Sequence, residues 1–434
     1  MSALDGSVVN TLLPILSLAL HTSVAGIEWV TTVYLLVISA LLLSVGRAGD
    51  LFGHKRIYIS GFVLFVIGSA LCGVARSSSW LIALRVIQAL GAAALMGTGP
   101  AILTRSFPAK ERGKALGALG TFTYLGLTAG PSLGGWLATA FSWRAVFYIN
   151  VPIGIIAILL AVRSVPDDRV AQQKERFDFV GASVFTSGLT TLLIALNQGH
   201  SWGWGSPAVL ALLAVSVVLL GVFIRVERHR TSPMLDLSLF ESRVFSASSV
   251  SALLNYACVY ALLFVLPFLL IQGRGLDAQH AGVVLTAQPV VMAIVAPFSG
   301  SISDRVGTRW PAILGMLILV AGLLLVAAFV RHGSLWAIAG GLAVIGFGIG
   351  TFVSPNNSAL MGAAPKNRQG IASGVLATSR NVGMVLGVGI AGAVFTTVVA
   401  HASAPSTALA DGVRASLLVS AGLALAGAGT SALR

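Results

Sequence analysis

Two charged residues of opposite sign lie within otherwise apolar stretches. Asp5 belongs to LDGSVVNTLLP (4–14) and Arg85 to LIALRVIQALGAA (81–93). Burial favours a protonated carboxyl, whereas water or a nearby cation favours the ionised form. Asp5 is therefore predicted to take up and release a proton as its surroundings change. The alternative is that Asp5 is a helix-start residue in water, because little of the chain precedes it.

Arg85 must find a partner, because a charge within an apolar span costs from about a few kcal/mol upward. We expect its side chain to face the interior of a helix bundle or a water-filled cavity. Gln88 lies one turn later on the same helix face. A structural arginine that pairs with backbone carbonyls is the alternative. Arg380, in the second half of the chain, allows the same two interpretations.

The composition predicts an all-α integral membrane protein. Hydrophobic residues make up 56% of the 434 residues and charged residues only 9%, whereas soluble domains carry about 25% charged residues. The mean hydropathy is +0.92. The apolar stretches have the roughly 17–25 residues with which a helix crosses a bilayer. The net charge of +13 is attributed to basic cytoplasmic loops and not to a nucleic-acid partner.

Fourteen membrane-spanning helices are predicted. They cover residues 4–20, 28–45, 57–75, 80–103, 114–138, 146–162, 179–197, 208–225, 245–271, 282–299, 311–330, 335–360, 372–399 and 413–431. With the amino terminus in the cytoplasm, the cytoplasmic segments carry 20 of the 27 Lys and Arg residues and the outer loops 5. This bias predicts a bacterial-type cytoplasmic membrane protein with both termini in the cytoplasm. Glu28, beside Trp29 at the outer end of the second span, is predicted to be interfacial, with a gating role as the alternative.

The chain contains an internal repeat. GRAGDLFGHKR (46–56) and GSISDRVGTRW (300–310) share Gly, Asp and Gly at matching positions. PAKERGKALG (108–117) matches PKNRQGIASG (365–374) at nearly the same offset. Two related six-helix halves are therefore predicted.

The offset between the repeats is longer than one half, which predicts an insertion. We expect an N-terminal six-helix bundle at 1–162 and a C-terminal six-helix bundle at 245–434. Residues 163–244 are predicted to hold cytoplasmic linkers and two inserted helices.

The repeated loop is predicted to act as a latch between the two bundles. Its glycines let neighbouring helices approach closely, and its Asp can accept backbone N–H bonds or pair with an Arg. Such a cluster can join two bundles in one state and release them in another; a turn with a topological charge cluster is the alternative. The residues are Gly46, Asp50, Gly53, Arg56 and Arg112 in the first half and Gly300, Asp304 and Gly307 in the second.

The segment GLTAGPSLGGW (126–136) places small residues and a proline along one stripe of a helix. Small residues permit a close helix crossing, and proline removes one backbone hydrogen bond and permits a bend. Tight packing alone is the alternative. The residues are Gly126, Gly130, Pro131, Gly134 and Gly135.

The sequence supports no enzyme, cofactor or metal centre. None of the five lysines lies in G-x-x-x-x-G-K-[ST], which argues against an ATP-driven pump, and the seven histidines lack metal-ligand spacing. Polar or aromatic residues inside spans are candidates for a substrate pathway, although packing explains each one as simply. They are Asn10, Tyr34, Gln88, Phe122, Tyr124, Asn255, Tyr256, Tyr260, Gln288, Met292 and Arg380.

These motifs resemble the major facilitator superfamily across the whole chain, and within it the fourteen-spanner drug:proton antiporter family. The loop 46–56 resembles the signature loop of the superfamily, and 126–136 resembles a fifth-helix motif associated with antiporters. The other matching stretches are the fourth-helix motif at 81–93 and the family-type segments 4–14, 29–36 and 377–390.

The resemblance implies a transporter that exports amphipathic or cationic drugs in exchange for protons by alternating access. It implies that Asp5 and Arg85 serve proton coupling and that 126–136 seals the outer side. The driving force would be the proton-motive force, without a cofactor. A dedicated exporter of one metabolite or antibiotic is the alternative, and a uniporter, a symporter and a channel are less well supported.

The expected partners are a small-molecule substrate, protons and the lipid bilayer. The protein is expected to be a monomer, and association with accessory export proteins is a further option. The family pattern places Asp5 another turn or two inside its helix. We therefore expect a truncated first helix, with Asp5 near the cytoplasmic rim of the membrane.

Overall fold

The computed structural model describes residues 1–106, 112–166, 178–203, 205–228, 237–331, 333–365, 369–402 and 407–434. Within these ranges the chain forms helices and connecting turns, and no strand. Thirteen helices in the described part are long and apolar enough to cross a membrane. The prediction of an all-α membrane protein is confirmed.

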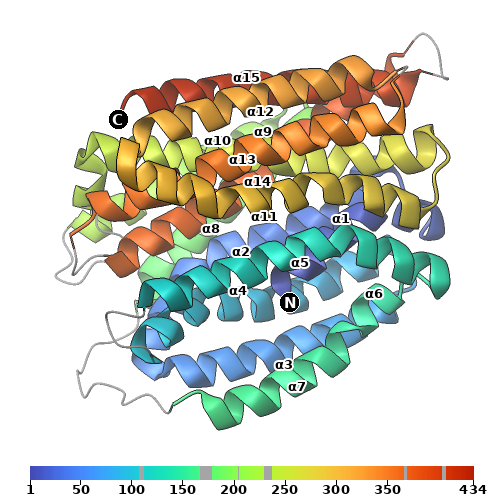
Figure 1. The fold of residues 1–434 in the computed structure, drawn as a ribbon. Helices are drawn as coiled ribbons and strands as arrows, with labels where there is room; N and C mark the ends of the chain where they lie inside the picture. The colour runs from blue at the N-terminus through green and yellow to red at the C-terminus, as the bar shows by residue number, and fades with distance from the viewer. Residues whose placement is uncertain are drawn as a thin grey trace.

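In the first half, the described residues form seven helices (Figure 1). They are α1 (Ser2–Ala19), α2 (Val24–Phe52), α3 (His54–Gly73), α4 (Ser78–Ser106), α5 (Arg112–Ala140), α6 (Ala145–Tyr148) and α7 (Asn150–Ser164). The sixth predicted span, 146–162, is thus divided into the short α6 and the longer α7. Two further helices follow, α8 (Phe179–Trp202) and α9 (Pro207–Arg228), where an insertion was expected.

The second half has six long helices and two short segments. The short ones are the 3₁₀ turn η1 (Leu237–Glu241) and the π-helical turn η2 (Phe268–Gly273). The long ones are α10 (Arg243–Pro267), α11 (Ala278–Val306), α12 (Arg309–Phe329), α13 (Leu335–Ala363), α14 (Gln369–Ala400) and α15 (Ala408–Ala432).

Several helices begin at residues whose side chains cap the free backbone N–H groups of the first turn. In each case the side-chain oxygen of a Ser or Asp accepts a hydrogen bond from the backbone N–H three residues later, as is usual for these residues at a helix start. The hydrogen bonds run to Ser23 at α2, Asp178 at α8, Ser242 at α10, Asp277 at α11 and Ser334 at α13.

The two halves pack alike, as the sequence repeat predicted. In the first half α1 contacts α5, α2 contacts α4 and α3 contacts α7; in the second half α10 contacts α14, α11 contacts α13 and α12 contacts α15. In Figure 1, α11–α15 lie together on one side of the molecule and α3, α4 and α7 on the other. The fold is therefore two six-helix bundles with two added helices, whereas the exact limits at 162 and 244 stay a prediction.

The largest contacts between the bundles are those of α5 with α11 and of α2 with α14, and α1 also packs against α10. The inserted helix α8 packs against both α2 and α14, and α9 packs against α8. We call the contact of α2 with α14 the α2/α14 seam. The inserted helices therefore cover this one seam between the bundles.

A further link joins α1 to the π-helical turn η2. The Gln272 side-chain amide donates to the Pro14 carbonyl and to the Ser17 hydroxyl, at 3.4 Å each. π-Helical turns are rare and occur mostly at functional positions. Here the π-helical turn follows Pro267 directly and contains Gln272, which it places next to the first bundle.

Candidate functional site

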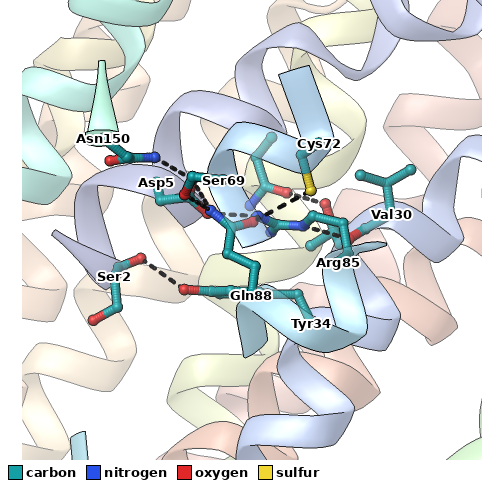
Figure 2. A network of polar contacts seen from close by, with 11 residues as sticks. Ser2, Asp5, Val30, Tyr34, Ser69, Cys72, Arg85, Gln88 and Asn150 are labelled. Atoms are coloured by element: carbon teal, nitrogen blue, oxygen red, sulfur yellow. Dashed lines mark hydrogen bonds and ion pairs between the residues drawn. The ribbon is translucent and has the colours of Figure 1, made fainter. Parts of the chain in front are cut away.

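The site is built around an ion pair between α1 and α4. Arg85 Nη1 donates to Asp5 Oδ2 at 2.5 Å, and both side chains are completely buried (Figure 2). Arg85 is one of the largest fully buried side chains in the described part of the chain. A partner for Arg85 was predicted, and the structure identifies it as Asp5, which lies 80 positions earlier.

Three neutral side chains complete the surroundings of the pair. The Gln88 amide donates to Asp5 Oδ1 at 2.9 Å and to Ser69 Oγ at 2.7 Å, while its carbonyl accepts from Arg85 Nη1 at 2.6 Å. The Asn150 amide also donates to Asp5 Oδ1, at 2.9 Å. Helices α1, α3 and α7 thus supply one residue each, and α4 supplies both Arg85 and Gln88 (Figure 2).

Arg85 is also held by α2. Its Nε donates to the Val30 carbonyl at 3.2 Å, and its guanidinium carbon lies 3.9 Å from the centre of the Tyr34 ring. A cation over an aromatic face is attracted by the ring. Arg85 Nη2 has no hydrogen-bond partner in the described part of the structure, so both of its N–H donors are unused.

The expected position of Asp5 at the cytoplasmic rim is wrong. Asp5 is 1% exposed, and two of the residues around it lie far from the loop 46–56: Ser69 is near the end of α3, and Asn150 begins α7. The alternative of a helix-start residue in water is excluded as well. Side chains from other helices enclose Asp5, which the local sequence could not show.

The buried network depends on the charges of both members of the ion pair. A buried ion pair is stable only while both charges are present, because removing one leaves the other uncompensated. Protonation of Asp5 would leave Arg85 with neutral acceptors alone.

The stripe of small residues on α5 forms close contacts on both of its sides. Gly130 and Gly134 face α1, where added Cβ atoms would lie 2.6 Å from Ser7 Oγ and 2.7 Å from a Val8 methyl group. The space left by these glycines is therefore filled by α1.

On the other side, α5 crosses the beginning of α11. A Cβ atom at Gly135 would collide with the Ala278 carbonyl, and one at Gly282 would collide with the Pro131 carbonyl. Asp277 caps this end of α11, and the backbone N–H of His280 lowers the pKa of its carboxyl. The two bundles thus meet backbone to backbone at this crossing.

The glycines of the repeated loops were predicted to let neighbouring helices approach closely; two of them instead have positive φ values. Gly53 and Gly307 adopt φ values of 97° and 84°, a region that other residues rarely adopt. A Cβ atom at Gly300 would lie 2.7 Å from Ser354 Oγ, whereas Gly46 approaches α4 less closely. Arg56 is exposed. The side chains of Asp50, Arg112 and Asp304 lie outside the described part, so the latch stays a prediction.

The proposed pathway residues are not gathered at one place. Gln88 and Tyr34 belong to the ion-pair network, and Asn10 accepts a hydrogen bond from Thr31 at 2.8 Å. Asn255 contacts the Met316 sulfur at 3.4 Å, inside the second bundle.

The remaining pathway residues are more dispersed. Arg380 lies 5.8 Å from the centre of the Tyr256 ring, and Gln288, Tyr260 and Met292 are buried. Phe122 is 72% exposed, which disfavours a place in an enclosed pathway. The side chain of Tyr124 lies outside the described residues.

Sequence reasoning missed Ser69 and Asn150, which contribute two of the polar contacts around Asp5 and Gln88. Each is a lone polar residue near the end of a helix, a pattern that turns and caps share. Among the described residues no group of three His, Cys, Asp or Glu could hold a metal ion.

Comparison with known proteins identifies the family. The sequence profile of the Major Facilitator Superfamily matches residues 1–388 and 248–433. The riboflavin transporter RibZ of Clostridioides difficile is 35% identical over 387 residues, covering 89% of this chain and 84% of RibZ. The multidrug resistance protein Stp of Mycobacterium tuberculosis is 32% identical over 395 residues, covering 91% of this chain and 73% of Stp.

A solved structure has the same fold. The bacterial homologue of the human lysosomal transporter Spinster, in an inward-facing and unoccupied conformation, superposes with a TM-score of 0.72 at 17% identity, covering 100% of this chain and 93% of that chain. The profile match, the two relatives and the fold agree with the motifs and with the duplicated bundles. The chain belongs to the Major Facilitator Superfamily and is a secondary transporter of that type.

Proposed function

We propose that this transporter exports amphipathic or cationic compounds in exchange for protons, with Asp5 as the proton carrier and Arg85 as its counter-charge. The observation that carries the proposal is the buried contact of 2.5 Å between Arg85 Nη1 and Asp5 Oδ2. A carboxylate in such a place changes its charge only if the surrounding helices adjust. Proton binding is therefore linked to the arrangement of the first bundle.

The coupling follows from the competition for Asp5. When a proton binds the carboxylate, the ion pair is lost and Arg85 must move toward water or another acceptor. A cationic substrate near the site would favour the ionised Asp5 and expel the proton. Binding of a proton from one side of the membrane and of substrate from the other would then favour the two states of the transporter alternately.

The proton-motive force suffices for this exchange without a cofactor. One charge moving across the membrane yields about 2.3 kcal/mol per 100 mV, and each pH unit adds about 1.36 kcal/mol. We place the protein in the cytoplasmic membrane with both termini in the cytoplasm, because 20 of its 27 basic residues lie in the segments that this orientation makes cytoplasmic.

The relatives support two substrate classes. Stp is named a multidrug resistance protein, which favours a broad range of exported compounds. RibZ is named a riboflavin transporter, which favours the second candidate, a transporter dedicated to one aromatic metabolite. A dedicated transporter would respond to one compound of a panel, and a multidrug exporter to several.

Inverted membrane vesicles test the proposal. With an imposed proton gradient, ethidium or another lipophilic cation should accumulate and dissipate the gradient, and Asp5→Asn should abolish both effects while the protein remains in the membrane. The panel should include riboflavin. If no compound accumulates or dissipates the gradient, drug:proton exchange is refuted.

A further inference from the structure

A second buried carboxylate lies at the α2/α14 seam and takes no part in the network of Asp5. Glu28, in the second turn of α2, is 6% exposed. Its Oε1 accepts a hydrogen bond from Asn197 Nδ2 at 2.8 Å. Asn197 belongs to the inserted helix α8, so a side chain of the insertion completes this contact.

Two glycines of α14 make room for these side chains. A Cβ atom at Gly392 would collide with Glu28 Oε2, and one at Gly389 would lie 2.9 Å from Asn197 Nδ2. Residues three apart share one face of a helix. The second bundle therefore covers the carboxylate and its amide partner with a surface that carries no side chains at these two positions.

No cation of the described residues reaches Glu28, whose one hydrogen-bond partner among them is Asn197. On α14, Arg380 lies twelve residues before Gly392, about 18 Å along the helix, and His401 follows by about 14 Å. On α4, Arg85 reaches α2 at the Val30 carbonyl and pairs with Asp5.

The remaining charged groups on the packed helices are distant or undescribed. Arg47, and Lys55 and Arg56 at the start of α3, lie toward the opposite end of α2. Asp178 precedes the first turn of α8, and His21 is exposed in the turn before α2. The side chain of His200 lies outside the described residues. A buried ionised carboxylate with one neutral donor costs several kcal/mol, and a proton removes this cost.

We propose that Glu28 is a second proton-binding site, which holds a proton while the α2/α14 seam is closed and releases it when α2 and α14 separate. Oε1 accepts from Asn197, and Oε2, which faces Gly392, carries the proton. On opening, the O–H bond at Oε2 breaks, the proton passes to water and the carboxylate becomes solvated. The inserted helix α8 thereby sets the proton affinity of the seam.

This site gives the two inserted helices a role. Helix α8 contacts both α2 and α14, and its Asn197 orients the Glu28 carboxyl while the seam is closed. The proposal rests on the proposed function in one respect: during transport the two bundles must separate at the α2/α14 seam and close again. Its chemistry can nevertheless be measured without transport, so failure of one proposal is distinguishable from failure of the other.

Infrared difference spectroscopy of the purified full chain during pH titration tests the site. We expect the C=O stretching band of a protonated carboxyl that is lost in Glu28→Gln, retained in Asp5→Asn and shifted to higher frequency in Asn197→Leu, where the hydrogen bond is gone. Glu241→Gln, at an exposed position in η1, is the matched control and should leave the band unchanged. A spectrum of Glu28→Gln identical to that of the unmodified protein overturns the proposal.

A distance measurement tests the link to the seam. Spin labels at Ala25→Cys and Ala400→Cys, both exposed at the ends of α2 and α14, report the seam, since the native cysteines are buried. Raising the pH should deplete the short-distance population, and Glu28→Gln should keep that population at every pH. Unchanged pH dependence in Glu28→Gln, with Glu241→Gln as the reference, overturns the link.

Discussion

Arg85 and Asp5, 80 positions apart in the sequence, meet at 2.5 Å in the interior of the first bundle. Neither residue has another ion-pair partner among the described residues. Each charge therefore stabilises the other in the buried position. This mutual dependence leads to the first two predictions.

Asp5→Asn should lower stability as well as abolish exchange. The substitution leaves Arg85 buried without a counter-charge, which typically costs about 3–5 kcal/mol. The measurement is thermal unfolding of the purified protein in detergent, together with proton exchange in vesicles. Asp5→Asn combined with Arg85→Gln should be less destabilised than the sum of the single variants; additive losses would show that the two charges are not coupled.

Arg85→Lys should retain the charge and still lose most of the exchange activity, by about tenfold or more. A lysine ammonium is a point charge without the planar fork that reaches Asp5, Gln88 and the Val30 carbonyl together. Substrate-driven proton release in proteoliposomes measures the loss. Exchange at the unmodified rate would assign Arg85 a role of charge alone.

Gly135→Ala should loosen the crossing of α5 with α11, because the added methyl group collides with the Ala278 carbonyl. We expect slower exchange and a larger proton leak, measured as the decay of an imposed pH gradient in proteoliposomes. Gly340→Ala on α13, where a Cβ atom would meet nothing within 4 Å, is the matched control. Equal leak rates for the two variants would remove the sealing role of this crossing.

Gly53→Ala and Gly307→Ala should each lower stability by about 1 kcal/mol, because their φ values of 97° and 84° place an alanine in a disfavoured backbone region. Thermal unfolding in detergent checks the loss. Gly221→Ala in α9 has neither a positive φ nor a neighbour within 4 Å and should be neutral or stabilising. Comparable melting temperatures for all three variants would contradict the argument.

Much of the fold follows from the sequence alone. The apolar stretches have the length of membrane-spanning helices, and the basic segments between them mark the predicted cytoplasmic loops. These properties are local, so they are visible wherever the chain is read. The matched loops at 46–56 and 300–310 added the duplication, because related sequences fold into related packing.

The candidate site could be predicted only in part. Asp5 and Arg85 stood out because an isolated charge in an apolar stretch is costly. Their pairing, and the contribution of Asn150, depends on which faces of α1, α4 and α7 meet. Those contacts are long-range, and no spacing in the sequence encodes them.

Glu28 illustrates the difference most clearly. The sequence determined that a carboxyl lies beside Trp29 at the end of an apolar helix, which is equally suited to a membrane interface. Only the tertiary structure brought Asn197 of α8 and Gly392 of α14 to that carboxyl. Burial is a property of the packed helices and not of any one of them, and it is burial that turns an ordinary acidic residue into a group whose charge depends on conformation.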